Sequence, residues 1–271
     1  MDPLSDLALP SRHVLTRLRD RRSGPVHIID PFKVPPSEAV EKARALDDLG
    51  FPFVILASTD YESFETRMPP YVARIKAATS LPVLLHFPPR KGTGFPLTPG
   101  ADAVILPALL GSQDDYFVWK SFLETLLTMP GRLDREQWPE LLLTVALTFG
   151  EDRRTGDLLG TVPVGTRTDR LDRHIDVAVS FGFHMVYLYS RHSHVPPDVV
   201  RHFRDRLHPD QILFVSGNVR SRDRVTAYLD AGADYVGFAG ALEDDDDWRT
   251  TLEALAAARP GLVPHIRGAR P

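Results

Sequence analysis

The chain has 271 residues, of which 43% are hydrophobic and 25% charged, a composition typical of a globular protein. Its formal net charge of −4 gives no sign of general nucleic-acid affinity, and the lack of cysteine excludes disulfides and thiol chemistry. No apolar run reaches the roughly 18 residues that a membrane-spanning helix needs. In the first 24 residues the charges follow the apolar part, which is not the order of a signal peptide. We therefore expect a cytoplasmic protein.

Residues 1–24 are predicted to form a short amphipathic lead-in segment, and residues 25–271 a single domain, because no internal linker interrupts them. After Gly24, short apolar runs rich in β-branched residues recur along the chain. Runs of this type predict buried strands. There are eight of them: Val26–Ile29, Phe53–Leu56, Pro82–Phe87, Ala103–Leu106, Leu141–Leu147, Met185–Leu188, Ile212–Val215 and Tyr235–Phe238.

Most of the intervening segments have helical periodicity. They are Ser37–Leu49, Glu62–Ala78, Gln113–Met129, Arg170–Phe181, Pro197–Leu207 and Ser221–Ala231, and Asp246–Ala258 follows the last run. The link between the third and fourth runs, "PPRKGTGFPLTPGAD", is too rich in proline and glycine for a helix and predicts a loop. The link Gly150–Arg167 is long and mixed, and we expect a mobile flap there.

Eight buried strands alternating with helices predict a parallel sheet, and eight strands are the number that closes a (β/α)8 TIM barrel. The alternative is an open doubly wound sheet. That fold favours a glycine-rich loop after the first strand, where this chain has "DPFK". The barrel is therefore the preferred prediction, with one helix replaced by a loop after the third strand.

Reactive groups of TIM barrels gather where the strands end. Polar or small residues follow several of the predicted strands at that point. These candidate site residues are Asp30, Lys33, Ser58, Thr59, His86, Tyr187, Tyr189, Ser190, Arg191, His192, Ser216, Gly217, Asn218, Ala239 and Gly240.

Two of these strand ends carry small residues, in "SGNVRS" after the seventh strand and "GFAG" after the eighth. Glycine lets backbone N–H groups come close to an anion, and these two loops are the usual phosphate site of the fold. A simpler interpretation is that each glycine only ends a strand. Because two such turns occur in the appropriate pair of loops, phosphate binding is the preferred hypothesis.

Asp30 ends the first strand, with Lys33 three residues later. An aspartate in this place can hold Mg²⁺ bound to a diphosphate, and a lysine can contact phosphate oxygens. Ser58 and Thr59 could add neutral oxygen ligands to the ion. Helix capping by Asp30, Ser58 and Thr59 and a solvated Lys33 are the alternative.

Two other segments resemble metal sites at first sight. His192 and His194 could share one face of an extended segment, but two histidines without a third ligand make a weak zinc site. The acidic run Glu243–Asp247 is more typical of a solvated helix N-terminus, where carboxylates suit the helix dipole.

With these residues in view, the chain from about Val26 to Leu255 resembles the geranylgeranylglyceryl phosphate synthase family, which includes the bacterial heptaprenylglyceryl phosphate synthases. The similar segments are "HIIDPFK", "LGFPFVILASTD", "ILPALLGSQDDYFVW", "VYLYS", "LFVSGNVRS" and "ADYVGFAGALED". The resemblance implies a TIM barrel, commonly a homodimer, that joins a prenyl diphosphate to a small phosphorylated alcohol. By position it implies Mg²⁺ on Asp30, with Ser58 or Thr59 nearby. It also implies that Tyr187 and the turns at Ser216–Asn218 and Ala239–Gly240 hold the acceptor's phosphate.

The chain also departs from the family pattern. Tyr189 stands where the family has a glutamate that handles the glycerol hydroxyls, His86 replaces another glutamate, and Phe32 replaces an aspartate. With Arg191 and His192 close by, these changes make the acceptor region more positive, which suits an acceptor with its own carboxylate. The chain therefore looks most like the moenomycin-type branch, which belongs to phosphoglycolipid antibiotic biosynthesis and prenylates 3-phosphoglycerate with farnesyl diphosphate.

The sequence thus predicts an Mg²⁺-dependent prenyltransferase that forms an ether between an isoprenoid diphosphate and the C2 hydroxyl of 3-phosphoglycerate. Asp30, Lys33, His86 and Tyr189 are its candidate catalytic residues. Either His86 or Tyr189 could take the hydroxyl proton, and a phosphate or diphosphate oxygen of a substrate is the alternative acceptor. One alternative acceptor is glycerol 1-phosphate. Another alternative is a metal-independent lyase or isomerase acting on a sugar phosphate, and a third is a barrel that only binds a phosphorylated metabolite.

Overall fold

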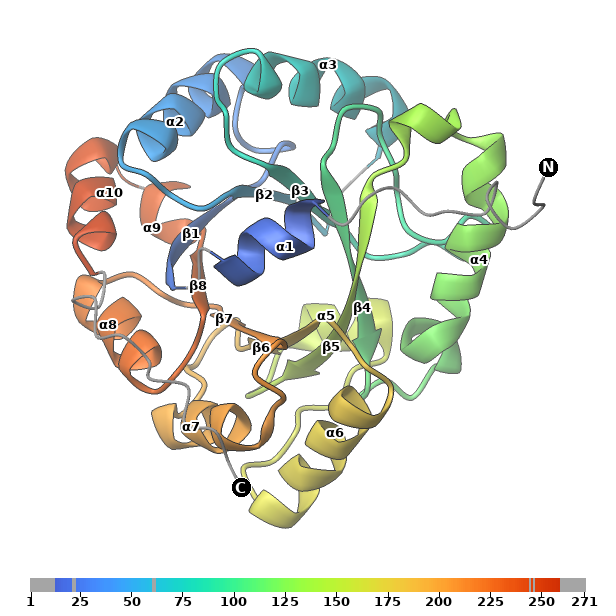
Figure 1. Cartoon of the computed structure of the whole chain (residues 1–271), viewed down its shortest axis with the longest axis vertical. Helices are drawn as coiled ribbons and strands as arrows, with labels where there is room; N and C mark the ends of the chain where they lie inside the picture. The colour runs from blue at the N-terminus through green and yellow to red at the C-terminus, as the bar shows by residue number, and fades with distance from the viewer. Residues whose placement is uncertain (1–12, 21–22, 60–61, 244, 246, 259–271) are drawn as a thin grey trace.

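The computed structural model describes residues 13–258 except 21–22, 60–61, 244 and 246, and its strands form a closed eight-stranded parallel barrel (Figure 1). The predicted TIM barrel is confirmed, because each strand pairs with its sequence neighbours and β8 pairs with β1. The strands are β1 (Gly24–Ile29), β2 (Val54–Ala57), β3 (Val83–His86), β4 (Ala103–Leu109), β5 (Glu140–Thr148), β6 (Met185–Tyr189), β7 (Ile212–Ser216) and β8 (Tyr235–Phe238).

Helices surround the barrel (Figure 1). They are α2 (Pro36–Asp48), α3 (Phe64–Lys76), α4 (Ser121–Thr128), α5 (Arg153–Leu159), α6 (Thr168–Ser180), α7 (Pro197–Arg206), α8 (Arg222–Asp230), α9 (Gly240–Glu243) and α10 (Trp248–Ala256). A π-helical turn, η2 (Tyr116–Lys120), precedes α4, and two 3₁₀ turns, η3 (Met129–Gly131) and η4 (Arg135–Gln137), follow it. Local chemistry sets several of the starts: proline occupies the first turn of α2 and α7, and the Ser221 hydroxyl accepts the Arg224 N–H at the start of α8.

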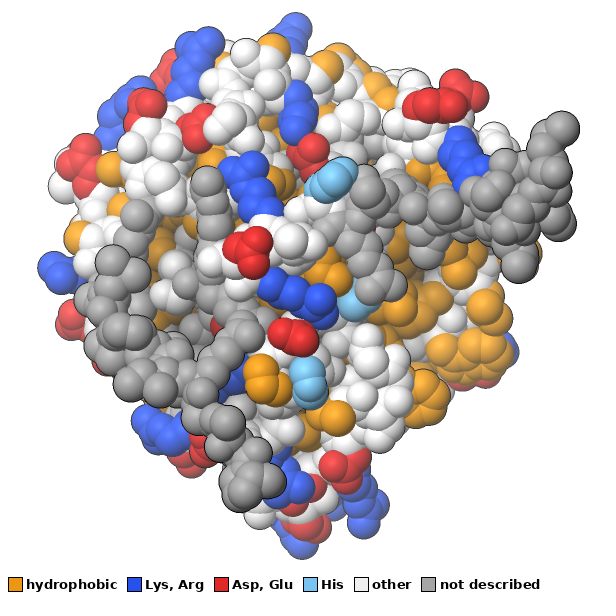
Figure 2. All heavy atoms as spheres, viewed as in Figure 1, with side chains coloured by type: hydrophobic (Ala, Val, Ile, Leu, Met, Phe, Trp, Pro, Cys, Tyr) orange, Lys and Arg blue, Asp and Glu red, His pale blue; other side chains and the backbone are white. Residues whose placement is uncertain are grey.

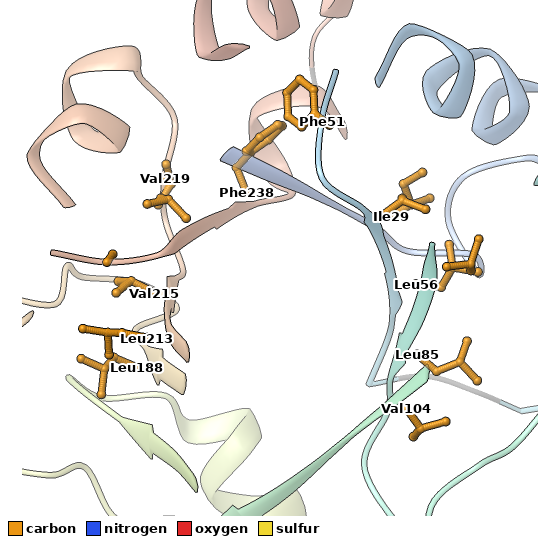
Figure 3. Close-up of a cluster of buried hydrophobic side chains, with 14 of the residues drawn as sticks. Ile29, Phe51, Leu56, Leu85, Val104, Leu188, Leu213, Val215, Val219 and Phe238 are labelled. Carbon is orange, nitrogen blue, oxygen red and sulfur yellow. The ribbon is translucent and has the colours of Figure 1, made fainter. Parts of the chain in front are cut away.

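The side chains of each strand alternate between two apolar layers. One set points out of the barrel and packs beneath the helices, as Figure 3 shows for Leu56, Leu85, Val104 and Leu213. The other set fills the barrel interior below the site. A parallel sheet covered on both faces needs near-continuous apolar strands, and this need explains the runs in the sequence.

Helix α1 (His13–Asp20) lies across the amino-terminal end of the barrel (Figure 1) and inserts Val14, Leu15 and Leu18 into the interior layer. The Glu140 carboxylate accepts the backbone N–H groups of Val14 at 2.8 Å and Leu15 at 3.3 Å. At the other end of the helix, the Tyr235 hydroxyl donates to the Leu18 carbonyl at 2.6 Å. Both ends of α1 are therefore tied to the barrel.

As predicted, no helix is present among the described residues between β3 and β4. The loop there is held by α4, since Glu124 accepts the backbone N–H groups of Gly92 and Gly94 at 2.8 and 3.1 Å.

The link after β5, where the sequence predicts a mobile flap, contains α5 and is hydrogen-bonded to its neighbours. Gln113 N–H donates to the Gly160 carbonyl, Val162 N–H to the Gly111 carbonyl, and Val164 N–H to the Thr148 carbonyl, at 2.7 to 2.9 Å. Helices α5 and α9 were both missing from the sequence prediction, because each is too short to show a helical period.

Candidate active site

A cavity of about 460 Å³ opens where the strands end at their carboxyl side. The order of the strands around the barrel determines which residues lie side by side in the cavity wall. The small-residue turns after β7 and β8 adjoin Asp30 after β1, and Ser58 and Thr59 follow at β2. Apolar residues then cover the side formed by β3, β4, β5 and α5. An anion site and an apolar groove therefore meet in one cavity, with a carboxylate between them.

The predicted site residues, which come from six strand ends, converge on this cavity, and all but Ser190 line it. Side chains alternate along β6, so Tyr187 and Tyr189 face the cavity and Ser190 faces away. The Ser190 hydroxyl is buried and bonds Ser193 Oγ at 2.7 Å, so the structure places Ser190 as a loop anchor beside the site.

Asp30 is fixed in place by its neighbours. One carboxylate oxygen accepts the backbone N–H of Phe32 at 2.9 Å, and the other accepts the Ser58 hydroxyl at 3.1 Å. Lys33 Nζ lies 3.8 Å from Asp30 and 3.2 Å from Glu243, so the lysine bridges two acids at the rim of the cavity.

The glycines of the predicted phosphate turns also have packing reasons. Gly217 has a φ of +100°, and a Cβ there would overlap the Ser190 carbonyl. A Cβ on Gly240 would lie 3.1 Å from a guanidinium nitrogen of Arg220. Arg220 lines the cavity and donates to the Gly240 carbonyl at 3.4 Å. The two turns therefore support an arginine, a group better suited to an anion than bare backbone alone.

Three aromatic groups form the floor on the β3 and β6 side. His86 packs edge-to-face on Tyr187 with ring centroids 5.3 Å apart, and Tyr187 bonds Ser216 Oγ at 2.5 Å. Burial lowers the pKa of His86 to about 4, so its imidazole is neutral at pH 7. Burial raises the pKa of Tyr187, and it raises the pKa of Tyr189 to about 12, with Arg191 opposing the shift. Both tyrosines therefore keep their protons.

The cavity wall that runs from β3 through β4 and β5 to α5 is apolar. Its residues are Phe87, Pro88, Pro89, Pro107, Leu109, Ala146, Leu147 and Leu159. Of these, Leu159 comes from α5, so this helix forms part of the groove. A wall of this kind can take a hydrocarbon chain and exclude water from it.

Sequence reasoning missed Arg220 and Glu243 in the cavity and Asp152 beside it. Arg220 stands two residues after Asn218 in "SGNVRS", a spacing that could have indicated it. Glu243 had been assigned to a solvated acidic run, yet it reaches Lys33 through the short helix α9. Asp152 carries no signal in the sequence, because its place depends on α5.

The donor set suits a magnesium ion that takes most of its ligands from a substrate. Mg²⁺ commonly binds one or two carboxylates and completes its shell with phosphate oxygens and water. Asp30 and the Ser58 hydroxyl provide such a partial set at the cavity wall. In the described part of the chain, no group of three or more His, Asp or Glu side chains could hold a metal ion. His192 and His194 therefore do not belong to such a group.

No family model matches the chain. Among characterised proteins, it is similar to the geranylgeranylglyceryl phosphate synthase of Cenarchaeum symbiosum, with 28% identity over 237 residues that cover 84% of this chain and 89% of that protein. The synthase of the same name from Thermofilum pendens is 26% identical over 260 residues, or 94% of this chain and 97% of that protein.

Solved structures show the same fold. The Thermoplasma acidophilum (S)-3-O-geranylgeranylglyceryl phosphate synthase, in complex with sn-glycerol-1-phosphate, superposes with a TM-score of 0.77 at 22% identity over 93% of this chain and 98% of that one. The Thermoplasma volcanium enzyme gives 0.76 at 19% identity, over 92% and 99% of the two chains. Orotidine 5′-phosphate decarboxylase from Pyrococcus horikoshii gives only 0.55 at 14% identity, over 86% and 98%.

These similarities support the relationship to the geranylgeranylglyceryl phosphate synthase family that the motifs indicated, since they extend along most of both chains. They do not distinguish the phosphoglycerate-using branch. No described helix is long and apolar enough to cross a membrane.

Proposed function

We propose that the protein is a prenyltransferase that joins a prenyl diphosphate to a hydroxyl group of glycerol 1-phosphate. The observation that carries this proposal is the arrangement of the cavity, in which the Arg220 turn, Asp30 and the apolar groove follow one another around the barrel. The sequence relatives are geranylgeranylglyceryl phosphate synthases, and a structurally similar synthase is solved with its substrate sn-glycerol-1-phosphate, which favours this acceptor over 3-phosphoglycerate.

In this reaction the acceptor oxygen forms a bond to C1 of the prenyl group while the bond from C1 to the diphosphate oxygen breaks. The diphosphate leaves with the bonding electrons, and the hydroxyl loses its proton. Asp30 and Ser58 would hold a magnesium ion, which supplies positive charge to the leaving group. Lys33, beside Asp30, adds a second cation at the same place. The apolar wall holds the prenyl chain and keeps water from the developing allylic cation.

The two candidate bases differ in what they can do. Tyr189, with its pKa raised to about 12, keeps its proton and acts as a hydrogen-bond donor. His86 is neutral and can accept a proton, although burial makes it a weak base with a pKa of about 4. A weak base is sufficient because the oxygen becomes strongly acidic once it bonds to carbon. We therefore assign proton acceptance to His86.

3-Phosphoglycerate is the second candidate acceptor. Arg191, His192 and Arg220 line the polar side of the cavity, and this concentration of basic groups suits a ligand with two acidic groups. The charge of Arg191 is partly offset, however, by Asp152 at 3.8 Å. If Arg191 binds a carboxylate, Arg191→Leu should impair turnover of 3-phosphoglycerate more than turnover of glycerol 1-phosphate. Equal losses would exclude that role.

The direct test is incubation with Mg²⁺, farnesyl or geranylgeranyl diphosphate, and either acceptor, with products read by mass spectrometry. We expect an ether product and release of diphosphate, and we expect EDTA to abolish both. Asp30→Asn should reduce kcat/KM by at least about 100-fold, because changes to the outer-shell partners of metal ligands already cost about 10- to 100-fold. The matched control is Asp230→Asn, the same change at an exposed position on α8.

Failure to form an ether with any substrate pair would contradict the proposal. Mg²⁺-independent turnover of a sugar phosphate would instead support the lyase or isomerase alternative.

We also propose that the protein forms a homodimer. Along η2 and α4, Trp119, Leu123, Leu126 and Leu127 are 44 to 82% exposed and recur with a spacing that places them on one helical face. Figure 2 shows hydrophobic side chains gathered on the side of the molecule where α4 lies. Exposed patches of this kind commonly mark protein interfaces. Light scattering should therefore give the mass of a dimer, and Leu127→Glu should give the mass of a monomer.

A further inference from the structure

Asp152 is a buried carboxylate next to the cavity for which the proposed reaction gives no role. Its side chain is 5% exposed, although it belongs to the loop between β5 and α5. An acid in this position opposes the binding of an anionic acceptor by simple charge repulsion. It caps α5 through Thr155, and it also lies beside Arg191.

The contacts of Asp152 connect α5 to the end of β6. One carboxylate oxygen accepts the Thr155 N–H at 3.2 Å and lies 3.8 Å from a guanidinium nitrogen of Arg191. The other oxygen accepts the Thr155 hydroxyl. Thr155 and Arg191 both line the cavity. The carboxylate is thus held by the first turn of a helix that forms the cavity wall.

The two loops involved are packed closely, which brings the backbones around Asp152 and Arg191 together. Gly150 has a φ of +70°, and a Cβ there would overlap the Ser193 hydroxyl. Phe149 N–H donates to the Tyr189 carbonyl at 2.7 Å. Arg191 is only 31% exposed, although an arginine beside an open cavity could extend into water.

We propose that Asp152 is a positioning residue that holds the Arg191 guanidinium at the cavity wall, where it meets an anionic oxygen of the acceptor. This inference rests on the proposed function, because it assumes an acceptor with a phosphate or carboxylate group. The gain from a fixed guanidinium outweighs the repulsion by Asp152, since an arginine already held in place loses little conformational freedom when the ligand binds.

The test is Asp152→Asn, which retains an oxygen to accept the Thr155 N–H, so α5 keeps its cap. We expect the Kd of sn-glycerol 1-phosphate, measured by calorimetry, and its KM to rise about five- to tenfold. The kcat and the KM of the prenyl diphosphate should stay within about twofold of the unchanged protein. The matched control is Glu151→Gln, the same loss of charge at the adjacent exposed position.

A second comparison separates positioning from other roles. In an Arg191→Leu background, Asp152→Asn should cause no further loss of acceptor affinity, because Asp152 acts through Arg191. Unchanged or tighter binding in the single variant, an additive loss in the double variant, or equal losses for both substrates would each overturn the inference. Ether formation by the unchanged protein is measured separately. Failure of the proposed prenyltransferase function can therefore be distinguished from failure of the positioning role of Asp152.

Discussion

Gly217 shows how one residue can serve both packing and the site. Its φ of +100° is a conformation that glycine adopts readily and other residues adopt only with strain. The close approach of the Ser190 carbonyl leaves no room for a Cβ, and Asn218, the next residue, is left-handed as well, with a φ of +51°. The turn after β7 is therefore held in shape by the end of β6, and the residues that follow it are placed at the cavity.

Alanine substitutions at Gly92 and Gly217 separate the cost of backbone strain from the cost of steric overlap with the Ser190 carbonyl. Gly92 has nearly the same φ, +97°, but a Cβ there would contact nothing within 4 Å. Gly92→Ala should lower the free energy of unfolding by about 1–2 kcal/mol, the cost of the backbone conformation alone. Gly217→Ala should lower it by about 2 kcal/mol more, because the loop must also move.

Urea denaturation would measure both losses, and an assay of turnover would show whether only Gly217→Ala impairs the site. Equal stability of the two variants would mean that the Ser190 contact does not constrain the turn.

At the scale of elements, the sequence predicts the barrel and most of the site for one physical reason. Parallel strands buried on both faces need continuous apolar runs, and their carboxyl ends meet on one side of the barrel. Asp30, His86, Tyr187 and Ser216 could therefore be assigned to one cavity from their positions alone.

The remainder of the site depends on contacts that have no sequence period. Asp152 and Leu159 reach the site only because α5 lies against the loops after β4 and β6, and Glu243 reaches Lys33 only because α9 begins directly after β8. Neighbouring side chains of a strand point to opposite faces, so Ser190 and Tyr189 face opposite ways. Which of the two faces the cavity could be predicted only once the end of β6 was known.

Helix α1 allows stability and activity to be separated at the scale of an element. Glu140, which is 7% exposed, accepts two backbone N–H groups at the start of α1, on the side of the barrel opposite the cavity. Glu140→Ala should lower the free energy of unfolding by about 2–3 kcal/mol, because charge-assisted bonds to buried N–H groups are lost. The kcat/KM of folded protein should remain within about twofold, since residues at the amino-terminal end of a TIM barrel serve stability.

The matched control for α1 is Glu136→Ala, at an exposed position in η4, which should leave both quantities unchanged. A large loss of activity in folded Glu140→Ala protein would show that the two ends of the barrel are coupled.

At the scale of the whole molecule, two histidines connect global stability to pH. His27 lies in the outer layer, stacked on Phe238 with ring centroids 5.2 Å apart, and burial lowers its pKa to about 3. His86 lies at the cavity, with its pKa lowered to about 4. The unfolded chain would bind a proton on each near the ordinary histidine pKa of about 6.5. Unfolding below that pH therefore takes up protons, and acid favours the unfolded state.

The free energy of unfolding should consequently fall as the pH is lowered from about 6.5 toward 4, with each histidine contributing a slope of about 1 kcal/mol per pH unit. Above pH 7 neither contributes, because both are neutral in either state. His86→Asn should reduce the slope between pH 5 and 6 by the contribution of one proton, as measured by urea denaturation at each pH. If His86→Asn left the slope intact, the imidazole would bind a proton in the folded protein as readily as in the unfolded chain, and burial would not lower its pKa as described.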